Sequence, residues 1–360
     1  EGDPECTLRA AIEEANAVGA VETIHFDIPD ALVGGAHTIA VSGSGLPAIT
    51  APVTIDASIE PDFAGTPIVE LNGAATTVGV RGLVLAAGSD GSTIRGLVVN
   101  RFADDGIYGT ADAVTVAGNY VGTDVAGTTD LGNGADGIQA NGNNWIIGGT
   151  TAADRNLVAG NSDDGIQLFG DGHTVIGNHV GTTAAGSGPL PNSDDGVEIA
   201  STSTGNTIGG LGAGEGNVIS GNGGEGVLIN ITTGNQVLGN HIGIDAAGSA
   251  PLGNTASGVN IKAGASGNTI GGPSAGAGNV ISGNGTFGIW LDDGDGNTIQ
   301  GNRIGTDAAG TGPVANTQHG IALVNGSDGN LVGGSGPGEG NLVAFNTLDG
   351  VIVTGATVDN

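Results

Sequence analysis

Acidic residues recur at one position of this sequence, directly before a glycine that opens an apolar run. Successive copies are Asp104-Asp105, Asp136, Asp163-Asp164, Asp194-Asp195 and Glu225. If these copies lie on neighbouring strands, their carboxylates stand about 5 Å apart, a separation suited to a nucleophile and a general acid in glycoside hydrolysis. Repulsion between them would raise one pKa enough for that group to act as the acid. Asp164, Asp195 and Glu198 are therefore the candidate catalytic residues.

A structural role in turns is the preferred explanation for the recurrence of these acidic residues. Aspartate before glycine accepts backbone hydrogen bonds and tolerates left-handed backbone, and a device repeated in nearly every copy is typical of structure. Ca²⁺ ligation ranks second, because stacked carboxylates repel one another unless a cation lies between them. Catalysis ranks third.

Outward positions after each of these glycines predict a polar face that could bind a polysaccharide. They combine amides, which hydrogen-bond sugar hydroxyls, with aromatic side chains. The candidate substrate-binding residues are Tyr108, Gln139, Gln167, Phe169, Asn260 and Trp290.

A recurring loop offers a second candidate site for Ca²⁺. Asp124, Asp245 and Asp307 open its copies and are followed nine residues later by Asn133, Asn254 and Asn316, whereas Thr183 replaces the acid in one copy. Hard oxygen ligands at fixed spacing suit Ca²⁺. Closure of the loop by the aspartate side chain is the preferred alternative.

Equivalent positions two copies apart hold Tyr120, His179, His241 and Arg303. Neighbours in this set would lie about 10 Å apart, too far for shared metal ligation. The pattern predicts an exposed stripe on a solvated strand face, with a lateral contact surface as the alternative.

Composition excludes several partners. Seven Lys and Arg against 37 Asp and Glu give a net charge of −30, which repels nucleic-acid phosphates and anionic membrane surfaces. No apolar run approaches the length of a membrane span. Cys6 is the single cysteine, so no internal disulfide forms. No cofactor is required, and Ca²⁺ is an optional stabilising ion.

An internal repeat determines the expected fold. Gly118-Asn119 returns as Gly177-Asn178, Gly239-Asn240 and Gly301-Asn302, about 61 residues apart, with a similar unit between each pair. Short alternating apolar segments separated by Gly, Asn and Asp predict three strands in each coil of about 30 residues. The sequence thus predicts an all-β, single-stranded right-handed parallel β-helix of about eleven coils.

Columns of stacked residues follow from this register. One apolar column is predicted at Ile208, Leu238, Ile270, Ile299 and Val332. Asparagine ladders are predicted at Asn161, Asn222 and Asn284 and at Asn178, Asn240 and Asn302. An amphipathic helix with Leu8, Ile12 and Ala15 on one face should cap the open end of the solenoid. The expected divisions are a cap over 1–22, irregular first coils over 23–92 and the regular double repeat over 93–360.

The N-terminal segment resembles a known group. Cys6-Thr7-Leu8-Arg9-Ala10-Ala11-Ile12 is similar to the CSLREA-type motif of secreted bacterial β-helix proteins, with Thr7 for Ser and Ala10 for Glu. Gly45-Leu46-Pro47-Ala48-Ile49 and Val53-Thr54-Ile55-Asp56 match that group's continuation. The resemblance implies an exported, often surface-attached protein and no particular reaction.

Regular coils without long loops favour a non-catalytic module of the cell surface or the extracellular space: a scaffold, fibre or adhesin segment. Its partner would be an extracellular polysaccharide or other copies of the same chain. The alternative function is a carbohydrate-active enzyme, a glycoside hydrolase or lyase, that uses the acidic cluster. A single lysine, Lys262, argues against a lyase acting on uronic polymers.

Overall fold

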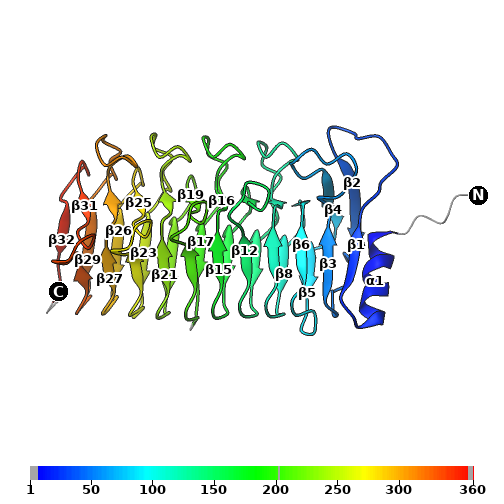
Figure 1. Cartoon of the computed structure of the whole chain (residues 1–360), viewed down its shortest axis with the longest axis horizontal. Coiled ribbons are helices and arrows are strands. Elements are labelled where there is room, and N and C mark those ends of the chain that lie inside the picture. The colour runs from blue at the N-terminus through cyan, green and yellow to red at the C-terminus, as the bar shows by residue number, and fades with distance from the viewer. Residues whose placement is uncertain (1–6, 202, 356–359) are drawn as a thin grey trace, which may run out of the picture.

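Three parallel sheets run the length of the molecule in the computed structural model, which describes residues 7–201, 203–355 and 360 (Figure 1). The chain visits the sheets in a fixed order, which we name sheets I, II and III. The fold is the predicted right-handed parallel β-helix. Sheets of eleven, eleven and ten strands agree with the expected number of coils.

Most strands have only two to four residues, as the short apolar segments predict. Sheet I contains β1 (Glu22–His25), β3 (Val53–Asp56), β6 (Thr93–Arg95), β9 (Thr115–Ala117), β12 (Ile146–Gly148), β15 (Thr174–Ile176), β18 (Thr207–Gly209), β21 (Gln236–Leu238), β24 (Thr269–Gly271), β27 (Thr298–Gln300) and β30 (Leu331–Val332). Sheet II contains β2 (His37–Gly43), β4 (Val69–Thr76), β7 (Leu97–Asn100), β10 (Tyr120–Val121), β13 (Leu157–Val158), β16 (His179–Val180), β19 (Val218–Ile219), β22 (His241–Ile242), β25 (Val280–Ile281), β28 (Arg303–Ile304) and β31 (Leu342–Val343). Sheet III contains β5 (Leu83–Leu85), β8 (Ile107–Gly109), β11 (Ile138–Ala140), β14 (Ile166–Leu168), β17 (Val197–Ile199), β20 (Val227–Asn230), β23 (Val259–Lys262), β26 (Ile289–Asp292), β29 (Ile321–Val324) and β32 (Val351–Val353).

Aliphatic side chains fill the interior in columns. Ile208 aligns with Val237, and Val237 with Ile270, all without exposed surface. The prediction of Leu238 in this column is wrong, because Leu238 aligns with Gly209 instead. Alternate residues of a strand point to opposite faces, so a shift of one position moves a side chain out of the core.

Helix α1 (Leu8–Val18), the single helix in the described part of the chain, covers the N-terminal end of the solenoid (Figure 1). Its buried residues are Leu8, Ile12 and Ala15, as its periodicity predicts. Thr7 caps its first turn by accepting a hydrogen bond from the Ala10 amide. Cys6, which begins the motif noted above, lies outside the described residues. Among the described residues, no helix is long and apolar enough to cross a bilayer.

Asparagine ladders join the coils at all three sets of turns. Between sheets I and II the ladder runs through Asn119, Asn156, Asn178, Asn217, Asn240, Asn279, Asn302 and Asn341. Between sheets II and III it runs through Asn133, Asn161, Asn192, Asn222, Asn254, Asn284, Asn316 and Asn346. Between sheets III and I it begins at His173 and continues through Asn206, Asn235, Asn268, Asn297, Asn330 and Asn360. The two predicted ladders are confirmed, each with further members between the predicted ones.

Four hairpin loops lie over sheet II and are visible along the upper edge of Figure 1. They span 123–130, 182–189, 244–251 and 306–313, each closed by one antiparallel bridge. The loops bond to one another, as where the Ala184 amide donates to the Gly127 carbonyl at 2.9 Å.

These hairpins cover the row that was expected to be an exposed stripe. His179 is only 4% exposed, and Tyr120, His241 and Arg303 are half-buried. The prediction of a solvated strand face is therefore wrong, because the loops fold back over the strands that precede them.

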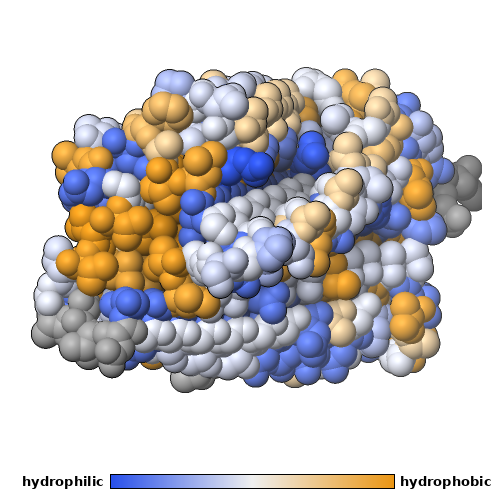
Figure 2. All heavy atoms as spheres, turned by 60° about the vertical axis from the view of Figure 1, so that its left-hand side comes forward, coloured by the Kyte–Doolittle hydropathy of each residue, from blue (hydrophilic) through white to orange (hydrophobic). Residues whose placement is uncertain are grey.

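The C-terminal end differs from the end covered by α1. Apolar side chains gather on its surface (Figure 2), among them Leu331, Leu342, Phe345, Leu348, Val351 and Val353.

Candidate functional site

The recurring acids form one column beside sheet III, which we name the acid column: Asp105, Asp136, Asp164, Asp195 and Glu225. The side chain of each aspartate accepts a hydrogen bond from the backbone amide of the next member. These N–H···Oδ1 distances are 3.2, 3.1, 2.9 and 2.6 Å in order along the column. The aspartates are only 2–3% exposed. The column thus ties neighbouring coils together, as the turn explanation expects.

Burial perturbs the acidity of the column. Removal from water raises the pKa of Asp136 to about 7, and the charges of Asp105 and Asp163 add to the effect. Burial also raises the pKa of Asp164 far above its usual range, and the neighbouring charge of Asp195 raises it further. The pKa of Asp195 is raised in the same way by burial and then by Glu225. A buried carboxylate surrounded by like charges is destabilised relative to the protonated acid.

Donors from neighbouring positions satisfy the second oxygen of the first three acids. Arg81 Nε donates to Asp105 Oδ2 at 2.7 Å. Further along, Gln139 Nε2 donates to Asp136 Oδ2 at 3.2 Å. The amide of Gln167 does the same for Asp164 at 3.2 Å.

This pattern breaks at the next coil. The residue equivalent to Gln167 is Glu198, as the strand register shows. An ionised carboxylate cannot donate a hydrogen bond. Glu198 instead accepts one from Gln167 Nε2 at 2.7 Å. Asp195 therefore has an acid beside it where the preceding acids have a donor.

A second acidic group lies at the edge of the column. Asp163, Asp164 and Asp194 each offer an oxygen within 4.8 Å of the others. Asp163 and Asp194 are exposed, whereas Asp164 is buried. The predicted catalytic residues Asp164, Asp195 and Glu198 thus lie together on two adjacent coils. Asp164 and Asp195 are buried, however, and the exposed carboxylates here are those of Asp163 and Asp194.

The outer row of sheet III carries most of the predicted substrate-binding residues. It comprises Tyr108, Gln139, Gln167, Glu198, Leu228, Asn260, Trp290 and Ala322, aligned strand by strand. A hydrogen bond from Gln139 Nε2 to Gln167 Oε1 at 2.7 Å joins neighbouring members. Phe169 lies just beyond β14 and is 37% exposed.

Aromatic groups stand at both ends of the row. At one end, the Arg81 guanidinium lies 3.6 Å from the ring centroid of Tyr108. At the other, Phe287 contacts Trp290 and stacks on His319, with centroid distances of 5.4 and 5.9 Å. Asn260 lies next to Trp290, buried, and donates to Glu225 Oε1 at 2.9 Å.

Arg81, Glu225 and Phe287 complete the face and were not among the predicted site residues. Glu225 and Phe287 occupy the position before the recurring glycine, so the repeat carried a signal for them. Arg81 also occupies this position, directly before Gly82 on the strand that pairs with β8, but it lies in an irregular part of the sequence and is not an acid.

The loop aspartates predicted to bind Ca²⁺ lie on the hairpins, away from sheet III. Asp124 Oδ1 accepts amide hydrogen bonds from Thr128 and Thr129, at 2.9 and 3.1 Å. The Asp245 carboxylate accepts from Ser249 and Ala250 in the same way, and Asp307 from Thr311. Their partner asparagines Asn133, Asn254 and Asn316 belong to the buried ladder between sheets II and III. Calcium ligation by these aspartates stays a prediction.

Comparison with known proteins gives a likeness of fold. No family model and no curated protein matches the chain. Among solved structures, the A-module of the Azotobacter vinelandii mannuronan C-5 epimerase AlgE6 is 18% identical, with a TM-score of 0.60, over 98% of this chain and 94% of that module. The A-module of AlgE4 from the same organism is 16% identical with a TM-score of 0.56 at the same coverage. These modules are parallel β-helices as well.

Proposed function

We propose that this chain is a secreted or cell-surface module that binds a polysaccharide along the outer face of sheet III without cleaving it. The observation that carries the proposal is the outer row, in which amide, carboxylate and aromatic side chains follow one another at the spacing of the coils, interrupted by the buried Leu228. Sugar chains are bound by such combinations of hydrogen-bonding groups and aromatic rings. The similar fold of two modules named for a polysaccharide, mannuronan, supports the same class of ligand. The resemblance of the N-terminal motif to secreted β-helix proteins supports the location.

The acid column argues against cleavage as the main activity. A general acid must reach the glycosidic oxygen, whereas Asp164 and Asp195 are 3% exposed and accept backbone hydrogen bonds from the next coil. With a net charge of −30, the protein should prefer neutral or basic chains to polyanions.

Tryptophan fluorescence offers a direct test, since the chain has two tryptophans. Trp145 is fully buried, so a change in emission on adding soluble neutral or amino-sugar oligosaccharides reports on Trp290. We expect Trp290→Ala to weaken binding, measured calorimetrically, by about tenfold, as for loss of one stacked ring. The control Ile146→Ala removes an exposed apolar side chain from sheet I and should leave affinity unchanged. Equal effects of the two substitutions, or no binding across the panel, would contradict the proposal.

Hydrolysis is the second candidate function, favoured by the strongly raised pKa of Asp164 beside the exposed acids Asp163 and Asp194. The same oligosaccharides are assayed for new reducing ends, which hydrolysis of a glycosidic bond creates. Product formation that Asp164→Asn and Asp194→Asn abolish, with melting temperatures no lower than that of the wild type, would replace the binding proposal by an enzymatic one. Association of the chain with copies of itself stays a prediction that sedimentation tests.

A further inference from the structure

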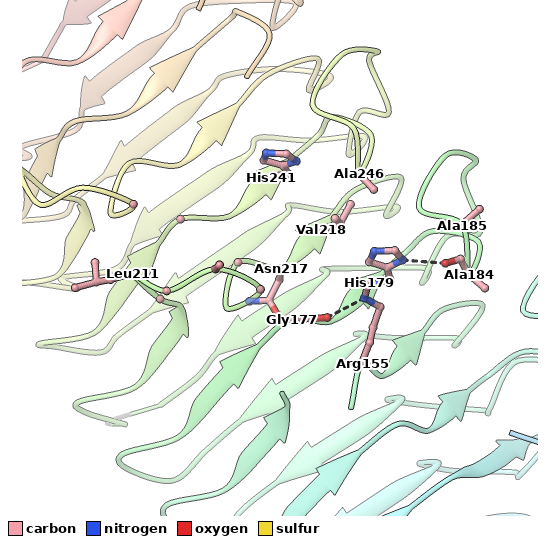
Figure 3. Close-up of a pocket in the computed structure, with 17 residues that line it drawn as sticks. Arg155, Gly177, His179, Ala184, Ala185, Leu211, Asn217, Val218, His241 and Ala246 are labelled. Atoms are coloured by element: carbon pink, nitrogen blue, oxygen red, sulfur yellow. Dashed lines mark hydrogen bonds between the residues drawn. The ribbon is translucent and has the colours of Figure 1, made fainter. Parts of the chain in front are cut away.

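A cavity of about 630 Å³ lies on the other side of the molecule, over sheet II (Figure 3). Its floor is formed by His179, Val218 and His241, which occupy the same position on the adjacent strands β16, β19 and β22. One wall is the turn 210–216 between sheets I and II. The other is formed by the hairpins, through Ala184, Ala185 and Ala246. Neither the acid column nor the outer row of sheet III contributes to it.

Arg155 makes this cavity different from the rest of the repeat. It directly precedes the ladder residue Asn156 in a long turn between sheets I and II. The equivalent residues in the other long turns are Gly216, Gly278 and Gly340. Structural devices in this chain recur from coil to coil, whereas this cation occurs once.

The Arg155 side chain is held in place at the cavity. Its Nε donates to the Gly177 carbonyl at 3.1 Å (Figure 3). Gly177 adopts a positive φ of 68°, and a Cβ there would lie 2.1 Å from the Gly149 carbonyl oxygen. The acceptor is thus fixed by a turn that requires glycine.

The terminal nitrogens of Arg155 remain available to a ligand. Arg81, Arg95 and Arg101 form ion pairs with carboxylates. Among the described residues, no carboxylate forms an ion pair with Arg155. The nearby acids are engaged elsewhere: Asp154 pairs with Arg95, and Glu215 accepts the amide hydrogen of Gly212 at 2.7 Å.

The two histidines supply uncharged polar groups beside this cation. Burial and the charge of Arg155 lower the pKa of His179 to about 4, and burial also lowers that of His241, against the opposing charge of Asp245. Both rings are therefore neutral at pH 7. A neutral imidazole whose Nδ1 donates to a carbonyl, as His179 does to Ala184 at 3.2 Å, keeps Nε2 as an acceptor for a hydroxyl group.

We propose that this cavity binds a sugar unit that bears an oxyanion, a carboxylate, sulfate or phosphate group. Arg155 binds the oxyanion through its terminal nitrogens, the arrangement in which guanidinium groups bind such anions most strongly. The sugar hydroxyls donate to His179 and His241, and the ring lies against Val218.

The test measures binding of sodium glucuronate, glucose 6-sulfate and glucose 6-phosphate to the whole chain, by calorimetry and by NMR of the histidine rings. Glucose and inorganic sulfate are the matched probes, each lacking one half of the ligand. We expect an acidic sugar to bind at least about tenfold more tightly than either, and Arg155→Gln to remove the advantage over glucose. Because a bound anion offsets the charge of Arg155, it should also raise the pKa of His179.

Two control variants separate this site from the general charge of the surface. Arg303→Gln removes the same charge from a row position outside the cavity and should leave affinity unchanged. Ala185→Glu places a bulky anion at the exposed rim and should block binding, whereas Ala309→Glu, at the equivalent position of the last hairpin, should not.

Equal losses of affinity for the acidic sugars in Arg155→Gln and Arg303→Gln would overturn the proposal. It would also be overturned if glucose bound as tightly as the acidic sugars. Inorganic sulfate binding as tightly as the sugar sulfate would overturn the assigned role of the histidines. Since oligosaccharide binding at sheet III is read from Trp290, failure at either face leaves the other result intact.

Discussion

The acid column beside sheet III and the asparagine ladder between sheets II and III join neighbouring coils through the same contact. In both, a side-chain oxygen accepts the backbone N–H of the equivalent residue in a neighbouring coil, which is the next coil in the acid column and the preceding coil in the ladder. They differ in the second group of the side chain. Asn254 uses its Nδ2 to donate to the Ile219 carbonyl and to Asn284 Oδ1, both at 3.0 Å, whereas an aspartate has only a second acceptor.

This difference explains why the ladder side chains satisfy their hydrogen bonds within the stack, whereas those of the acid column do not. Each side-chain amide of the ladder is uncharged and finds partners for its donors and its acceptor in the neighbouring coils. Each acid of the column needs a donor or a proton from outside it, which Gln139 and Gln167 supply for Asp136 and Asp164. At Asp195 the outer row offers Glu198 instead. The column thus couples the backbone of the solenoid to the outer face, which the ladders do not.

Removal of a ladder amide should give the largest effect. In Asn254→Ala, the amide groups of Asn222 lose the acceptor that they bond at 3.1 and 2.9 Å. The Ile219 carbonyl and Asn284 Oδ1 also lose a donor. Buried unpaired groups cost about 1–3 kcal/mol each, partly relieved by water, so we expect a loss of roughly 3–5 kcal/mol in the free energy of unfolding by chemical denaturation. A loss below 1 kcal/mol would mean that the ladder contributes little to stability.

Asp164→Asn should act in the opposite direction. The pKa of Asp164 is raised in the folded state, so the folded chain binds a proton more tightly than the unfolded chain. Its contribution to stability is complete below pH 4 and is lost as the pH rises through the raised pKa. An asparagine at this position keeps the side-chain oxygen that accepts the Asp195 amide. Because it does not ionise, it also removes the fall in stability at high pH. We expect the variant to gain on the order of 1–3 kcal/mol over the wild type at pH 9 and to match it at pH 4.

Asp163→Asn is the matched control for this comparison, because it removes the same charge from the adjacent, exposed residue. A gain as large as that of Asp164→Asn would show that general charge reduction, and not relief of a buried acid, is responsible. Thermal denaturation across pH 4 to 9 measures both variants.

The fold and the position of the acid column could be predicted from the sequence. The fold follows from a repeat of glycine, asparagine and short apolar segments, and the acid column follows from Asp105, Asp136, Asp164 and Asp195 at one repeat position. The burial of the column was not predictable, because it depends on how neighbouring turns pack. The same holds for His179, which is hidden only because hairpins two coils apart bond directly, as Ala184 does to Gly127.

Other features are visible in the sequence as departures from the repeat, but the repeat alone does not show which departures matter for function. The change from Gln167 to Glu198 in the outer row is visible in the sequence, but its meaning depends on Asp195 lying behind it. Arg155 is likewise visible as the one non-glycine among four equivalent residues. The cavity beside it required the three-dimensional arrangement of a turn and two hairpins.

Asp136→Asn should give a smaller gain than Asp164→Asn. Burial raises the pKa of Asp136 to about 7, so stability is lost as the pH rises from about 4 to 7, and the difference between variant and wild type should then level off. For Asp164→Asn it should keep growing above pH 7. Melting temperatures at half-unit steps of pH distinguish the two profiles. Identical profiles would mean that the acids titrate as one group, without the ordering that their surroundings impose.

The smallest effect should come from Asp245→Thr, on the hairpin 244–251 that directly precedes the large-effect residue Asn254. Burial opposes ionisation of Asp245, but the Ala250 and Ser249 amides outweigh it and lower its pKa, so its contribution is present at neutral pH and fades as the pH falls below 4. Thr183 holds the equivalent position in another hairpin, which still closes with a hydrogen bond from its amide to Gly188 at 2.9 Å. The loss should therefore stay below about 1 kcal/mol. Calcium separates the remaining alternatives: a calcium-dependent rise in melting temperature that the variant lacks would assign Asp245 to ligation, whereas equal curves with and without calcium would assign it to loop closure.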